Sequence, residues 1–195
     1  MTETAEPLVA PSRFPASNVS RVGRALASFL AIGSVLAAGL TLAWYLQFVF
    51  AGPSASLYVE KIGPGAKLIP AGQLNFDGES FSCGALPTVL QPGFQDYGAA
   101  YFGFIILNPE RFSTLPVTLK RFAFSHECGH QFVGYSETAA DCYAVGRGLR
   151  DGWLGRESLE EICSFFVKSK GSVFHLPGPL RCSAIRECYK NRGGP

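Results

Sequence analysis

The sequence predicts an α+β domain that is preceded by one transmembrane helix. Short apolar runs separated by Gly and Pro fill residues 57–107, and helical apolar spacing begins at Pro116 and continues toward the C-terminus. Because the strands come first and the helices follow, this order indicates a small N-terminal sheet with C-terminal helices. A third observation, an uncharged apolar run ahead of the domain, predicts the membrane helix.

Residues 25–51 carry no charged side chain. At about 1.5 Å per residue, a helix of this length more than spans a hydrocarbon core roughly 30 Å thick. A cleaved signal peptide has an apolar region of only about 7–15 residues, so we interpret the run as an uncleaved anchor. Release of the domain by cleavage near Ala51 or Ala55 stays open as the alternative.

Basic residues flank this run on one side only. Arg13, Arg21 and Arg24 precede it, and no Lys or Arg follows it before Lys61. The excess of positive charge predicts that residues 1–24, a tail without apolar periodicity, are disordered and cytoplasmic. The C-terminal domain is then expected outside the cytoplasm, in the periplasm or the extracellular space.

Charge and cysteine content narrow the class of protein. A net charge of +2, with no basic stripe in the domain, argues against a nucleic-acid partner. All six cysteines follow the apolar run, and an even number in an exported domain predicts disulfides whose pairing the sequence does not determine. No C-x-x-C pair occurs, which argues against a zinc ribbon.

The domain is expected to comprise a linker with its first strands over residues 52–75 and a main body over residues 76–195. Strands are predicted at 57–62, 67–69 and 101–107, with an irregular stretch over 76–95. Helices are predicted at 117–132, 137–149, 156–168 and 179–189, with Gly134 and Ser136 marking the end of one helix and the start of the next.

The chemistry is concentrated in an H-E-x-x-H motif formed by His126, Glu127 and His130. Residues four apart share one face of a helix, so the two imidazoles can bind one Zn²⁺ at about 2.0–2.1 Å. Glu127 lies about 100° around the helix from His126, which places its carboxylate beside the metal as a general base. A catalytic zinc needs a third protein ligand and an open fourth position for water.

Two acidic residues can supply that third ligand. The metzincin class would need Gly and His where this chain has Val133 and Ser136, so it is excluded. Glu137 and Asp141 are four apart and share a helical face that the turn after His130 can direct toward the histidines. We assign Glu137 as ligand and Asp141 as the acceptor that orients a ligand histidine, and the reverse assignment stays open.

His126–His130 followed by Glu137–Asp141 resembles the H-E-x-x-H and E-x-x-A-D pair of the gluzincin metallopeptidases. Within that family the pattern is most similar to the membrane-bound CAAX prenyl protease and heat-shock membrane protease group. The segment from His175 to Arg181 is similar to the late H-P-x-x-x-x-R segment of that group, with Pro displaced by one. The resemblance implies a zincin-like fold, zinc-dependent hydrolysis of peptide or protein substrates, and roles for His175 and Arg181 in substrate binding or oxyanion stabilisation.

This chain departs from the group in two ways. The spacing between His130 and Glu137 is shorter than in the group, and the group's multiple membrane spans are missing. His175 can instead be a loop residue that caps a helix, and Arg181 can form a structural ion pair. Cys128 and Cys142 are interpreted as disulfide or core cysteines.

One strand prediction concerns substrate binding. The strand at 101–107 is expected either to be an edge strand that pairs with the substrate backbone or to be buried in the sheet.

Two functions follow from these patterns. The first is a membrane-anchored zinc peptidase with Glu127 as its base. The second is a non-catalytic, disulfide-stabilised scaffold or interaction domain whose zinc is structural.

Overall fold

The computed structural model describes residues 33–42 and 54–194. The chain divides into two units, Met1–Phe50 and Ala51–Pro195. Residues 33–42 are helical, whereas the predicted tail and the rest of the predicted anchor lie outside the described residues. In the part of the chain that is described, no helix is long and apolar enough to cross a membrane.

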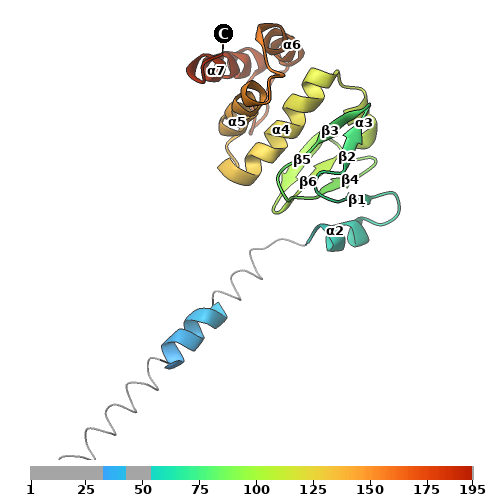
Figure 1. The fold of residues 1–195 in the computed structure, drawn as a ribbon, viewed down its shortest axis with the longest axis vertical. Coiled ribbons are helices and arrows are strands. Elements are labelled where there is room, and N and C mark those ends of the chain that lie inside the picture. Colours follow the sequence, from blue (N-terminus) through green and yellow to red (C-terminus); the bar gives the residue numbers. More distant parts are fainter. Residues whose placement is uncertain (1–32, 43–53, 195) are drawn as a thin grey trace, which may run out of the picture. The chain divides into compact units, whose positions relative to one another are not determined.

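The second unit is an α+β domain, as predicted (Figure 1). Its N-terminal half contains α2 (Ala55–Ile62), six short strands and α3 (Pro109–Ser113). The strands are β1 (Lys67–Ile69), β2 (Leu74–Phe76), β3 (Glu79–Phe81), β4 (Thr88–Leu90), β5 (Gly98–Tyr101) and β6 (Phe104–Leu107). The C-terminal half contains α4 (Val117–Val133), α5 (Glu137–Arg150), α6 (Arg156–Phe166) and α7 (Gly178–Asn191).

The larger sheet has the order β1-β4-β6-β5. Strand β6 pairs in parallel with β4 and antiparallel with β5, so it is an interior strand and β5 lies at the edge. All four residues of β6 are buried because both faces of the sheet are covered. Ile105 and Leu107 belong to the main core with α4, whereas Phe104 and Ile106 pack in a smaller cluster with Ala55 of α2.

This arrangement corrects the prediction of an edge strand over residues 101–107. The run is divided by a turn, and its strand half is buried in the sheet, in agreement with the alternative interpretation. The edge strands are β1 and β5, and β5 is the one that packs beside α4 (Figure 1).

Two further predictions in the N-terminal half were wrong. Residues 57–62 are helical rather than extended because the Ser54 side chain caps α2 by accepting a hydrogen bond from the Leu57 N–H. The stretch predicted to be irregular contains the β2–β3 hairpin and β4. The hairpin turns at Asp77-Gly78, where both residues have positive φ, as a two-residue type I′ connection requires.

The helical half agrees closely with the sequence. Helix α4 ends at Gly134, which has a φ of 70° and donates its N–H to the His130 carbonyl. Ser136 caps α5 by accepting a hydrogen bond from the Ala139 N–H. Ala140 and Ala144 are fully buried, and an added Cβ at Gly129 would meet Tyr143 at 3.1 Å, so these small residues let α4 and α5 pack closely.

Three disulfides join the six cysteines, which confirms the predicted use of cysteine. The pairs are Cys83–Cys128, Cys142–Cys188 and Cys163–Cys182. Two of them connect α7 to α5 and to α6, and the third joins the β3–β4 connection to α4. The half-cystine Cys128 lies inside the H-E-x-x-H motif, so this covalent bond holds the motif helix against the sheet.

Candidate metal centre

The two histidines of the motif converge on one point. His126 and His130 lie on successive turns of α4, with their Nε2 atoms 3.1 Å apart. His126 is buried and His130 is partly buried. The next helix supplies a carboxylate to the same point: Glu137 Oε2 lies 3.1 Å from His126 Nε2, and Glu137 Oε1 lies 3.6 Å from His130 Nε2.

These separations fit a tetrahedral zinc site. Ligand atoms about 2.0–2.1 Å from a tetrahedral ion are about 3.3–3.4 Å from one another, close to the distances among the three donors. In the described part of the chain, the three residues whose ligand atoms all lie within 4.8 Å of one another are His126, His130 and Glu137. The donor set of two imidazoles and one carboxylate is also one that catalytic zinc uses.

The Nδ1 atoms of both imidazoles already make hydrogen bonds. His126 Nδ1 donates to Asp141 Oδ1 at 2.7 Å, and His130 Nδ1 donates to the Gly134 carbonyl at 2.7 Å. When each ring carries a single proton, at Nδ1, both Nε2 atoms present lone pairs, and these face each other across 3.1 Å. A cation between them relieves that repulsion, and the Nδ1 contacts are those of metal-binding histidines.

Glu137 also has a ligand atom that lacks a hydrogen-bond partner among the described residues. Its Oε2 is buried and makes no hydrogen bond to any residue in the described ranges, although two imidazole nitrogens lie near it. An unsatisfied buried carboxylate oxygen is costly unless it binds a cation. The residues therefore fit a metal ion.

Arg181 binds the carboxylate of Asp141. Its Nε and Nη2 donate to the two oxygens of Asp141 at 2.8 and 2.7 Å, and its guanidinium lies 4.1 Å from the centre of the Phe166 ring. A chain of contacts therefore runs from Arg181 through Asp141 to His126. The structure contains the ion pair that the alternative interpretation of Arg181 expected, whereas a direct contact of Arg181 with substrate stays a prediction.

Electrostatics favour a positive charge at His126. Burial lowers the pKa of this imidazole, but the carboxylates of Asp141 and Glu137 beside it outweigh the burial and raise the pKa to about 9. Burial would raise the pKa of Asp141 and of Glu137, yet their interactions with His126, and of Asp141 with Arg181, lower both values. The carboxylates therefore stay ionised and stabilise either a proton or a metal cation on the imidazole.

Glu127 lies between α4 and the edge strand. The N–H of Ala100 in β5 donates to its carboxylate, and an added Cβ at Gly98 would come within 3.3 Å of Glu127 Cγ. Burial raises the pKa of Glu127 and outweighs the opposing effect of His126 and His130. A carboxyl group whose pKa is raised is a stronger base, which suits it to accept and return a proton.

His175 also lies near this group, although it comes from the loop between α6 and α7. Its Nε2 is 2.9 Å from Glu137 Oε2, and its Nδ1 is 3.3 Å from the Ser172 hydroxyl. Burial lowers its pKa, so the neutral ring is favoured. His175 does not belong to the described set of three converging ligands.

Sequence reasoning missed the backbone groups of the site. Gly98 and Ala100 adjoin Glu127, and the Gly134 carbonyl orients His130, but a run of small residues carries no signal of such contacts. Only Gly134 could have been found, because a glycine that ends the motif helix leaves helical carbonyls near the second histidine.

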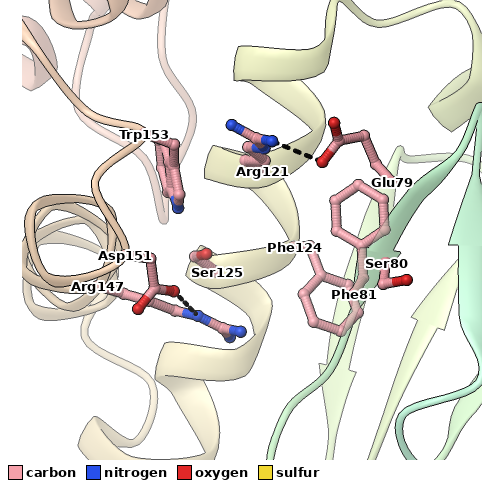
Figure 2. A pocket seen from close by; sticks show the side chains of 9 residues that line it. All are labelled: Glu79, Ser80, Phe81, Arg121, Phe124, Ser125, Arg147, Asp151 and Trp153. Atoms are coloured by element: carbon pink, nitrogen blue, oxygen red, sulfur yellow. Dashed lines mark hydrogen bonds and ion pairs between the residues drawn. The ribbon is translucent and has the colours of Figure 1, made fainter.

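A polar cavity of about 210 Å³ lies on a different face of α4 (Figure 2). None of the predicted site residues lines it. Its two arginines are neutralised by carboxylates, since Arg121 pairs with Glu79 at 2.6 Å and Arg147 with Asp151 at 3.3 Å. The cavity therefore offers no unmatched charge comparable with that of the metal centre.

Comparison with known protein families, curated proteins and solved structures finds no match. The resemblance to the gluzincins stays a prediction.

Proposed function

We propose that this protein is a zinc-dependent peptidase. The observation that carries the proposal is the position of Glu127, whose partly buried carboxylate adjoins two histidines and Glu137, the three residues that converge as metal ligands. A purely structural metal site has no use for an additional carboxylate with a raised pKa. A hydrolytic site needs one as its base.

The residues have separate roles in this proposal. His126, His130 and Glu137 would hold zinc, while Asp141 and the Gly134 carbonyl fix the orientation of the two imidazoles. A bound zinc ion would supply Lewis acidity, which lowers the pKa of water and polarises the peptide carbonyl. Glu127 accepts a proton as water adds to the carbonyl carbon, and it donates that proton to the leaving amine.

The edge strand β5 offers a place for the substrate backbone. It lies at the open side of the sheet beside α4, and its Ala100 adjoins Glu127. An extended peptide that adds to this edge would bring its backbone close to the base. Ala99 and Ala100 present little side-chain bulk, which favours recognition of the backbone over recognition of particular side chains.

The test is the Glu127→Gln variant of the full chain. Zinc content should remain at the wild-type level because Glu127 is not a ligand, while hydrolysis of an unfolded protein substrate should fall by about 100-fold or more. Zinc is measured on the purified protein, with chelator-treated wild type as the inactive control. Wild-type hydrolysis by this variant would refute the mechanism.

A second candidate function rests on His175. Its contact with Glu137 allows a four-ligand site, which is how structural zinc is usually held, and the domain would then be a disulfide-stabilised scaffold. His175→Ala distinguishes the two functions. A catalytic site keeps its zinc without His175, whereas a structural site loses zinc and stability together.

A further inference from the structure

Exposed apolar side chains lie on three separate segments, each of which adjoins a residue of the metal centre or its helix in the chain or through a hydrogen bond. We call them the apolar rim, which consists of Phe102, Phe132, Val133, Tyr135, Val173 and Phe174. Tyr135 is 100% exposed, Val173 96% and Phe174 79%, although each would be expected to prefer an apolar environment. Apolar residues grouped this way mark an interaction surface more often than isolated exposed ones do.

The first two segments of the rim are held together by one side chain. Gln131 of α4 donates through Nε2 to the Tyr101 and Phe104 carbonyls, at 2.6 and 3.2 Å, and its Oε1 accepts from the Gly103 N–H at 3.1 Å. The β5–β6 turn, which carries Phe102, is therefore fixed to the last turn of α4, which carries Phe132. Tyr135 follows on the connection to α5.

The third segment adjoins the metal centre directly. His175 contacts Glu137, and Val173 and Phe174 precede it in the same loop. Lys168 and Lys170 lie slightly earlier and are exposed. The loop thus presents cationic and apolar groups side by side, as segments that bind anionic membrane surfaces do.

The chain enters the domain next to this rim. Ala55, at the start of α2, is buried with Phe104, and the Tyr58 ring lies 5.7 Å from that of Tyr101 and 5.2 Å from that of Phe104. Figure 1 shows α2, the β5–β6 turn and the α4–α5 turn on the same side of the domain. The first helix of the domain therefore leads directly to the turn that carries Phe102.

The uncharged apolar run ends at residue 51, so a connection of three residues, 52–54, precedes α2. Three extended residues span at most about 11 Å. If the run is a membrane anchor, this connection tethers the domain to a bilayer, which favours lipid as the surface that the rim meets.

We propose that the apolar rim inserts into the headgroup region of a lipid bilayer, which holds the metal centre at the membrane surface. The aromatic side chains of the rim suit that region, and Lys168 and Lys170 suit anionic lipid. Docking depends on the exposed side chains and not on catalysis, so it can hold or fail independently of the proposed peptidase function.

The test uses the full chain reconstituted in vesicles of zwitterionic and anionic phospholipid. The six native cysteines are paired, so a cysteine introduced by Tyr135→Cys or Phe174→Cys is a unique site for an environment-sensitive fluorophore. The matched control is Val117→Cys, which is 44% exposed and begins α4, about 24 Å along the helix from Val133.

We expect a blue-shifted emission at positions 135 and 174, quenching there by a lipid-borne quencher, and neither effect at position 117. Emission at 135 and 174 that matches position 117 would overturn the proposal. A blue shift without quenching by lipid would also overturn it, because the rim would then be covered by protein, such as a second copy of the chain.

Discussion

Replacing Arg181 with Met tests whether this residue acts through the metal centre or on the substrate. The substitution keeps most of the side-chain length but removes both hydrogen bonds to Asp141. Asp141 is buried, so among the described residues its carboxylate would keep only the contact with His126. Breaking a buried pair from one side costs about 3–5 kcal/mol of folding stability.

The same change should weaken zinc binding. Groups that orient a ligand histidine contribute about 10- to 100-fold to metal affinity, which corresponds to about 1.4–2.8 kcal/mol. Zinc affinity is measured by competition with a coloured chelator, and stability by urea unfolding of the chelated protein. Both measurements are independent of any peptide substrate.

Arg186→Met provides the matched control. Arg186 lies on the same helix and forms a bidentate pair with Glu160, but both partners are about half exposed. An exposed pair contributes little to stability, so this variant should keep wild-type zinc affinity and nearly wild-type stability. Unchanged zinc affinity in Arg181→Met, together with lost hydrolysis, would refute the positioning role and favour contact with substrate.

Three further predictions concern pH, the edge strand and the disulfide in the motif. Because the pKa of His126 is raised to about 9, about 3 kcal/mol of stability in chelated protein should be present below pH about 6.5 and lost as pH rises toward 9. Urea midpoints measured with and without zinc check this, and a flat profile in chelator would contradict it. Gly98→Ala would place a Cβ 2.9 Å from a Leu107 methyl group and 3.3 Å from Glu127 Cγ, so kcat/KM should fall about tenfold with zinc content unchanged. Loss of zinc together with activity would show a general disruption instead. Replacing Cys83 and Cys128 with Ala opens a loop with a sequence separation of 45 and should cost about 4 kcal/mol in thermal or urea unfolding, whereas an unaltered midpoint would mean that packing alone holds the helix.

The ligand geometry was accessible from sequence because it depends on local spacing. His126 and His130 share a face by helical periodicity, and Glu137 reaches them because a glycine and a serine confine the turn to a few residues. Asp141 then follows one turn after Glu137, where it meets His126. Each of these steps involves residues that are close in the chain.

The surroundings of Glu127 were not accessible in the same way. Strand β5 adjoins the motif helix through the order of the sheet, and no local pattern states that β6 is interior or that β5 is the edge. The apolar run of β6 indicated burial correctly but could not identify the neighbouring strand. Helix α2 was missed because its apolar residues resemble those of a strand, although Ser54 was a usable capping signal.

The disulfide between Cys83 and Cys128 has a consequence for the order in which the metal centre matures. A free thiolate binds zinc strongly, and in the reduced chain Cys128 stands two positions from each motif histidine. Reduced chains can therefore capture zinc through a sulfur that the folded centre does not use. Oxidation removes that competing ligand, so, if His126, His130 and Glu137 bind zinc as proposed, formation of the Cys83–Cys128 bond before the ion arrives favours correct loading.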